Sequence, residues 1–192
     1  MDGNALAGCR QEIPQATQTR ADVASLADVD RLFDDVKRAL GGLDVLVNNA
    51  GIAGPTAKVE DIRPEDWERC IAVDLNGMFY CTRKAMPLIK AAGGGSIINL
   101  SSIAGRFGFA LRTPYSAAKW AVVGFTQSLA AEAGPDGVRV NCIQPGIVEG
   151  ERVEGRPENH GHRAGHRQHG ALPRHRCGQP HQRLGDFGVR RR

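Results

Sequence analysis

Apolar positions recur along the chain with two different spacings, one typical of helices and one typical of strands. Over residues 26–40 an apolar residue appears every three or four positions, which predicts an amphipathic helix with Ser25 as its N-cap and Gly41 at its end. The same spacing predicts helices over 64–92, with a kink or interruption near Gly77, and over 114–133.

Short apolar runs separate these helices and predict strands. The runs at 43–51, 96–102 and 138–146 are typical of buried strands, and a shorter extended segment precedes the first helix at 16–23. Strands that alternate with helices indicate βαβ units with right-handed crossovers. The sequence therefore predicts an α/β fold with a doubly wound parallel sheet, in which ligands bind at the carboxyl ends of the strands.

The helix over 114–133 begins with a tyrosine and a lysine four positions apart. Tyr115 and Lys119 would project from one face, where the ammonium would stabilise a phenolate and let Tyr115 exchange a proton near neutral pH. The alternative is an ordinary amphipathic helix with a half-buried tyrosine and a solvated lysine. The motifs at the ends of the predicted strands distinguish these two interpretations.

Each predicted strand ends in residues that could face a ligand. They are Asp22 and Val23, then Asn48 to Gly51, then Ser101 and Ser102, then Pro145 and Gly146. Ser102 lies thirteen residues before Tyr115 and could hydrogen-bond a substrate carbonyl while the tyrosine protonates it. Alternatively, the serines cap a turn and the asparagines occupy a loop, although the joint order of these motifs argues against this.

With NNAG at 48–51, a serine thirteen residues before YxxxK, and PG at 145–146, the sequence resembles the classical short-chain dehydrogenase/reductase family over about residues 5–150. The resemblance implies a Rossmann-like fold, NAD or NADP as cofactor and a small alcohol or carbonyl substrate. It implies that Tyr115 is the catalytic acid/base, Lys119 its activating partner and ribose ligand, and Ser102 the substrate-orienting donor. The implied cofactor contacts are Asp22, Val23, Asn48, Ala50, Gly51, Pro145, Gly146 and Val148. It also implies a homo-oligomer formed through the two long helices.

One departure from the family lies in AVDLNGMF. Asp74 stands where the family usually has its fourth catalytic residue, an asparagine, and Asn76 follows two residues later. A carboxylate can still accept a hydrogen bond from a bridging water, so a proton relay through Lys119 is retained with altered charge. The alternative is that position 74 only marks the helix kink.

A second departure is the family's opening strand, glycine-rich phosphate loop and helix, which nothing in MDGNALAG resembles. We therefore expect a partial Rossmann-like domain in which the strand near 17–22 has no neighbour and the strand at 43–48 has an open edge. Cofactor binding and activity are expected to be impaired. A non-enzymatic, dimerising fragment is the alternative function.

Charge divides the chain into a domain over 1–150 and a tail over 151–192. The first part carries 15 Lys+Arg and 17 Asp+Glu, whereas the tail carries 10 Arg, 4 acids and all six histidines. Without apolar periodicity the tail is expected to be disordered. The alternatives are that the tail binds nucleic acid or a metal ion. No stacking aromatic side chains interleave with its arginines, and its histidines lack the spacing typical of metal ligands. Translation in the wrong reading frame, with a break near 153–155, is the interpretation that we favour.

The cysteines and the hydropathy indicate a cellular compartment. Five dispersed cysteines without CxxC pairs are typical of reduced thiols. No apolar run approaches the length of a membrane span, and no signal peptide opens the sequence. We expect a cytoplasmic protein with no metal site and no membrane partner.

Overall fold

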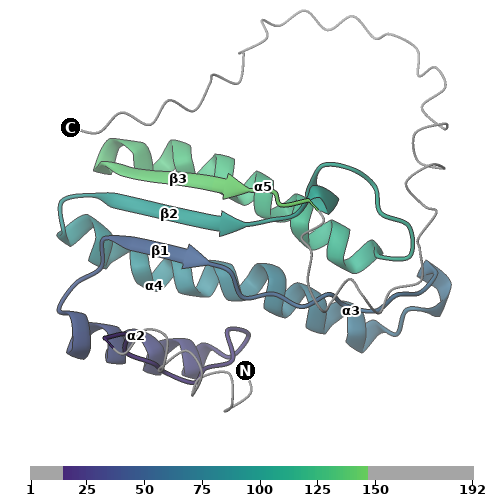
Figure 1. Ribbon diagram of the computed structural model, residues 1–192, viewed down its shortest axis with the longest axis horizontal. Helices are drawn as coiled ribbons and strands as arrows, with labels where there is room; N and C mark the ends of the chain where they lie inside the picture. Colours follow the sequence, from purple (N-terminus) through teal and green to yellow (C-terminus); the bar gives the residue numbers. More distant parts are fainter. Residues whose placement is uncertain (1–14, 147–192) are drawn as a thin grey trace, which may run out of the picture. The chain divides into compact units, whose positions relative to one another are not determined.

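A three-stranded parallel sheet forms the centre of the fold. The computed structural model describes residues 15–146, which belong to the unit Met1–Glu158, one of two into which the chain divides. The strands are β1 (Val45–Asn48), β2 (Gly95–Leu100) and β3 (Val138–Ile143), and they lie in the order β1-β2-β3. Figure 1 shows that all three arrows point to the same end of the sheet. The predicted α/β architecture with a parallel sheet is confirmed.

The helices follow the local signals of the sequence closely. The first, α2, spans Leu26–Leu40: Ser25 Oγ accepts a hydrogen bond from the Asp28 amide, and Gly41 ends the helix with φ 71°. The predicted interruption near Gly77 is a π-helical turn, η2 (Ala72–Asn76), between α3 (Pro64–Ile71) and α4 (Gly77–Ala91). The last helix is α5 (Thr113–Ala133). Three short 3-10 turns complete the described elements: η1 (Val59–Asp61), η3 (Ile103–Gly105) and η4 (Gly134–Asp136).

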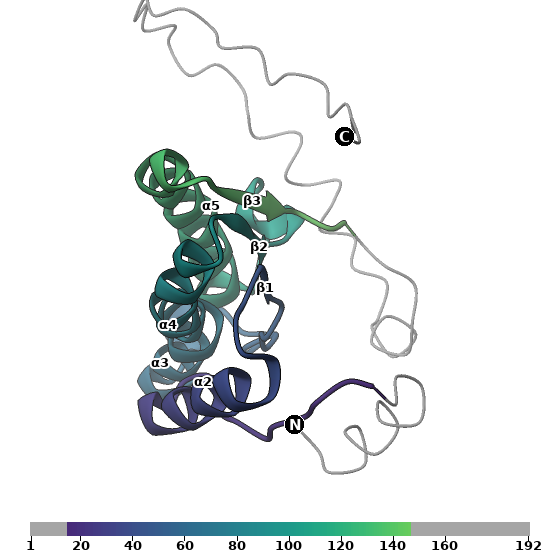
Figure 2. The same ribbon diagram turned by 90° about the vertical axis from the view of Figure 1, so that its left-hand side faces the viewer.

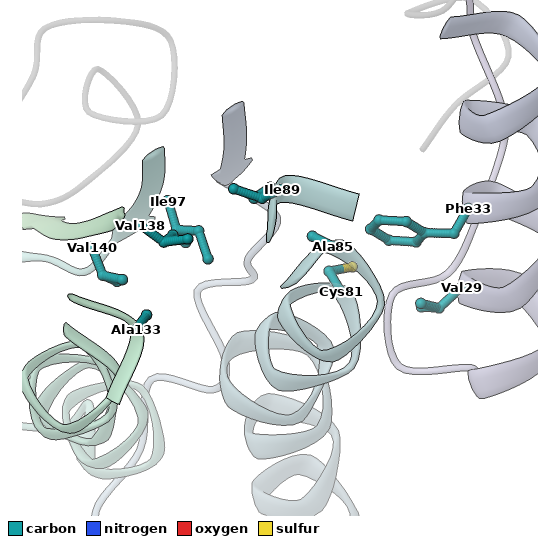
Figure 3. Packing of buried hydrophobic residues seen from close by; sticks show 9 residues of the cluster. All are labelled: Val29, Phe33, Cys81, Ala85, Ile89, Ile97, Ala133, Val138 and Val140. Atoms are coloured by element: carbon teal, nitrogen blue, oxygen red, sulfur yellow. The ribbon is translucent and has the colours of Figure 1, made fainter. Parts of the chain in front are cut away.

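The described helices gather on one face of the sheet. Both α4 and α5 contact the strands, and α2 packs against α4 (Figure 2). Side chains of all three helices and of two strands form one apolar cluster, drawn in Figure 3: Val29, Phe33, Cys81, Ala85, Ile89, Ile97, Ala133, Val138 and Val140. This cluster holds the helices in place, so the residues that end the strands and begin α5 have fixed positions.

The segment predicted as an unpaired strand near 17–22 has no neighbouring strand within residues 15–146, as expected. Its residues form no strand in the structure, and Val23 and Ala24 form a turn. A strand needs a neighbour for its backbone groups, and within residues 15–146 no strand pairs with this segment. Side-chain bonds hold it instead, such as that from Thr19 Oγ1 to Asp35 Oδ2 at 2.7 Å.

The expectation that the predicted strands are buried on both faces is wrong in part for β1 and β3. Val45 and Val47 of β1 are 49% and 53% exposed, and Arg139 and Ile143 of β3 are exposed too. These side chains alternate with the buried ones because the described helices cover only the opposite face. The apolar run therefore predicts the strands correctly but not how many of their faces are covered.

Two expectations lie partly or wholly outside the described residues. The tail at 151–192 and the candidate cofactor contact Val148 belong to the part of the chain that the structure does not describe. Across residues 15–146, no helix has the length and apolar character needed to cross a membrane.

Candidate active site

The carboxyl end of β2 is joined directly to α5 at the predicted catalytic lysine. Ser101, just after β2, donates through Oγ to the backbone oxygen of Lys119 at 2.7 Å. A Cβ added at Gly105 would lie 2.5 Å from that same oxygen, so η3 can approach α5 only because residue 105 is glycine. Ser102 caps η3, and its Oγ accepts from the Ala104 amide at 3.2 Å. This packing fixes the Ser102 backbone beside the start of α5.

Tyr115 and Lys119 lie one turn apart on α5, as the spacing predicts, but their polar ends are arranged differently. The Lys119 ammonium lies over the Tyr115 ring, 5.5 Å from its centroid, and donates to the Leu100 backbone oxygen at 3.1 Å. Lys119 is 5% exposed, so the alternative of a solvated lysine is wrong. A buried ammonium that contacts an aromatic ring and a strand end is held in one place.

Asp74 brings a buried carboxylate to this lysine. It lies in the π-helical turn and is 2% exposed. Its Oδ1 accepts from the Ile52 amide at 2.7 Å, and its Oδ2 is 3.9 Å from Lys119 Nζ with no hydrogen-bond partner. Burial raises the pKa of the Asp74 carboxyl, and the Ile52 hydrogen bond and the Lys119 charge offset only part of that rise. Asp74 therefore lies both at the kink and next to Lys119.

Gly51 lies against the Asp74–Lys119 pair. A Cβ added there would be 3.2 Å from Asp74 Oδ1 and 3.3 Å from Lys119 Nζ. Both Gly51 and its neighbour Ala50 are exposed, at the start of the loop that follows β1. The loop thus presents bare backbone above a buried ammonium, which leaves space for a polar ligand.

Asn48 is directed toward the helices. Its Nδ2 donates to Asn99 Oδ1 at 2.8 Å and to Thr82 Oγ1 at 3.1 Å. Asn99 in turn donates to Thr126 Oγ1 at 3.0 Å, so one polar network links β1 and β2 with α4 and α5. Sequence reasoning missed Asn99, although a fully polar amide inside the apolar run at 96–102 was a signal.

The adenine-side candidates lie in the turn before α2. The Asp22 carboxylate accepts from the Ala24 amide at 3.0 Å and pairs with Arg69 at 3.1 Å. Val23 lies against Gly77, where an added Cβ would be 2.7 Å from Val23 Cγ2. The turn is therefore anchored to α3 and to the start of α4.

The predicted contacts after β3 border the serine. The backbone oxygen of Pro145 accepts from the Ile103 amide at 2.9 Å, and Gly146 next to it is exposed. Ile103 follows Ser102 directly, so these two strand ends meet. Sequence reasoning also missed two groups that hold the site, the Ile52 amide and the Leu100 carbonyl.

No metal cluster accompanies these residues. Within the described range 15–146, no group of three or more His, Cys, Asp or Glu side chains could hold a metal ion.

Comparison with known proteins gives a consistent family. The family described as short chain dehydrogenase matches residues 3–160. A 2-dehydro-3-deoxy-L-rhamnonate dehydrogenase (NAD(+)) of Sphingomonas sp. is 36% identical over 83% of this chain and 64% of its own length. A trans-4-hydroxycyclohexanecarboxylate dehydrogenase of Sinomonas cyclohexanicum is 52% identical over 57% of this chain and 41% of its own.

Solved structures agree with this likeness. An NAD+-bound xylitol dehydrogenase superposes with a TM-score of 0.76 at 29% identity, over 80% of this chain and 60% of that one. The NADP-bound protein ElxO superposes with a TM-score of 0.69 at 30% identity, over 72% of this chain and 56% of that one. This chain spans between 41% and 64% of the lengths of the two relatives named above. It belongs to the short-chain dehydrogenase/reductase family.

Proposed function

We propose that the protein is an NAD(P)-dependent oxidoreductase that interconverts a small alcohol and its carbonyl compound. The observation that carries the proposal is the buried Lys119 ammonium, which lies over the Tyr115 ring and is held by the end of β2. A structural lysine at a helix start gains little from such burial, whereas an acid/base tyrosine needs a fixed cation beside it.

The residues around Lys119 fit the nicotinamide end of the cofactor. Gly51 leaves an exposed backbone surface within reach of the ammonium, and Gly146 borders the same strand ends. The candidate contacts for the whole cofactor are Asp22, Val23, Asn48, Ala50, Gly51, Tyr115, Lys119, Pro145 and Gly146, together with Val148 outside the described residues. When bound, NAD(P) supplies or accepts the hydride.

The side chains of this chain would handle the proton and the substrate oxygen. Ser102 Oγ already accepts from the Ala104 amide, so its hydroxyl hydrogen is left to donate to a substrate oxygen. Tyr115 would give its proton to that oxygen during reduction and take it back during oxidation. The packing of η3 against α5 fixes Ser102 and Tyr115 relative to each other.

Lys119 and Asp74 would support the tyrosine. One Lys119 hydrogen goes to the Leu100 oxygen, and two more remain for a ribose hydroxyl or for the tyrosine oxygen. Asp74 Oδ2 is 3.9 Å from the ammonium and has no hydrogen-bond partner, so it is placed to accept from a water that returns protons to Lys119. We assign Asp74 this relay role in place of the usual asparagine.

The described residues offer no comparable group for the pyrophosphate end of the cofactor. Among residues 15–146, no glycine-rich turn of the dinucleotide-binding kind joins a strand to a helix. A polypeptide of these 192 residues is therefore expected to bind NAD or NADP weakly and to turn over slowly. The substrate is proposed only as a small alcohol or carbonyl compound.

The test compares Tyr115→Phe with Tyr80→Phe, the same substitution at the second of the two tyrosines. Binding of NADH and NADPH is followed by fluorescence, and reduction of a panel of small ketones is followed by absorbance. Both are measured in the 192-residue polypeptide and in a chimaera that carries the family's glycine-rich segment.

We expect Tyr115→Phe to lower turnover by about 100-fold or more, because only the transferable proton is lost. Its cofactor affinity and the turnover of Tyr80→Phe should stay close to those of the unmodified protein. Full turnover in the chimaera with Tyr115→Phe would remove the tyrosine from its role. A chimaera that binds neither cofactor would contradict the proposed function itself.

A further inference from the structure

A buried arginine ties the start of α5 to the loop that follows β1. Arg112 directly precedes α5 and is 8% exposed. Its Nη1 donates to Thr56 Oγ1 at 2.8 Å and to the Gly54 oxygen at 3.2 Å, with a weaker contact of 3.5 Å to the Pro55 oxygen. A guanidinium is buried only where its donors find acceptors, so this contact is specific.

A second tether runs through the backbone beside it. Leu111 has φ 63°, in the left-handed region that non-glycine residues rarely adopt. Its oxygen accepts from the Ala57 amide at 3.1 Å. Strained backbone persists where its surroundings hold it and is concentrated at functional sites. Two consecutive residues therefore fasten the end of the 106–112 loop to residues 54–57.

Both ends of this tether lead to the candidate active site. The Arg112 oxygen accepts from the Ser116 amide at 2.9 Å, so Arg112 begins the helical turn that carries Tyr115. At the other end, residues 54–57 closely follow Gly51 and Ile52, which contact Asp74 and Lys119. The position of the arginine thus fixes the tyrosine relative to the loop that lines the proposed cofactor site.

We propose that Arg112 is a positioning residue for Tyr115, which it holds in register with the 51–57 loop through the Gly54 and Thr56 bonds. Its effect on turnover rests on the proposed function. Its effect on the place of the tyrosine does not.

The first measurement is independent of activity. The chain has two tyrosines, Tyr80 and Tyr115, so incorporation of 3-fluorotyrosine gives two ¹⁹F resonances, which Tyr80→Phe assigns. We expect Arg112→Met to shift or broaden the Tyr115 resonance and to leave that of Tyr80 unchanged. The matched control is Arg106→Met, because Arg106 lies in the same loop, is exposed and lies over the ring of its neighbour Phe107.

The second measurement separates positioning from general stability. In the chimaera with the family's glycine-rich segment, Arg112→Met should lower kcat by about 10- to 100-fold, the cost of misplacing a reacting group by up to an ångström. The Kd for NADH should change by less than about threefold, since Lys119 and Gly51 keep their places. Arg106→Met should change neither quantity.

A Tyr115 resonance that moves no more in Arg112→Met than in Arg106→Met would overturn the proposal, whatever the enzyme does. An unchanged kcat in an active chimaera would overturn it equally. Absence of turnover in the unmodified chimaera would contradict the proposed function alone, and the resonance would still decide the role of Arg112. If Arg112→Met does not fold, Arg112→Lys replaces it. We expect Arg112→Lys to shift the Tyr115 resonance more than Arg106→Met does, and an equal or smaller shift would overturn the proposal.

Discussion

Asp74 stands at the position where the resemblance to the family implies an asparagine. From the sequence, position 74 could be either a relay residue or a mere kink. The structure places Asp74 in the π-helical turn and also 3.9 Å from Lys119, so it marks the kink and lies beside the lysine as well. The sequence could not reveal this, because the Ile52 amide and Lys119 reach Asp74 from other segments of the chain.

The pH dependence of stability should report this carboxyl. Because its pKa is raised in the folded protein, the folded state holds the proton more tightly than the unfolded state does. The ionised Asp74 carboxylate therefore lowers the free energy of unfolding at pH values above the ordinary carboxyl pKa, and this loss disappears at lower pH. We expect Asp74→Asn to gain in Tm relative to the unmodified protein between pH 4 and pH 7, by about 3 °C or roughly 1 kcal/mol.

Thermal unfolding followed by circular dichroism measures this difference. Asp136→Asn is the control, because Asp136 is half exposed and its ion pair with Lys90 lies at the surface. A Tm difference for Asp74→Asn that stays constant or narrows with rising pH would show that the carboxyl is not destabilised by burial.

Tyr115 and Lys119 illustrate what residue spacing can and cannot predict. Their four-residue separation places them on one face of α5, as expected. The ammonium nevertheless lies over the ring, because the Leu100 oxygen and the Asp74 carboxyl attract it from β2 and η2. Helical periodicity fixes directions within one helix, whereas partners from other elements depend on how the elements pack.

Among the elements, the helices and the three paired strands were predictable, whereas the coverage of the sheet was not. The bounds of α2 follow from Ser25 and Gly41, which are local signals that need no partner. The segment at 16–23 forms no strand because it has no neighbour to pair with, which was expected from the lack of any likeness to the family's opening strand. The exposure of one face of β1 depends on which helices cover the sheet, and the apolar run of β1 does not encode this.

The contact between η3 and α5 gives a test at this scale. A Cβ at Gly105 would lie 2.4 Å from Ser101 Oγ and 2.5 Å from the Lys119 oxygen, so Gly105→Ala must push η3 away from α5. We expect a loss of about 1–3 kcal/mol, as for other overpacked sites, seen as a lower midpoint in urea unfolding. Gly108→Ala, where nothing lies within 4 Å, should change the midpoint little. Equal midpoints for the two variants would mean that η3 can move without cost.

For the whole molecule, the outer sides of the helices suggest association. Trp67 of α3, Phe79 of α4 and Trp120 of α5 are 40%, 45% and 52% exposed. Large exposed aromatic side chains are typical of interfaces, and on this ground we propose that the protein forms a homo-oligomer through these helices. We expect Trp120→Arg to weaken self-association at least about tenfold, or 1.4 kcal/mol, in sedimentation equilibrium.

The control for this substitution is Leu40→Arg, which changes a residue of similar exposure (59%) at the end of α2. It should leave the association constant unchanged. If the unmodified protein is monomeric, or if both substitutions weaken self-association equally, the surface around Trp120 is not the interface.

The parallel order β1-β2-β3 has a consequence for how the chain folds. Val45 pairs with Ser96, and Ser96 pairs with Arg139, so each strand pair closes a loop that contains an entire helix. Such loops cost entropy before any pairing compensates for it, which makes folding slower than in proteins with local contacts. During synthesis the nascent chain can form α2 and α4 early. The β1–β2 pair uses only residues that emerge from the ribosome before β3, whereas the complete sheet must wait for β3.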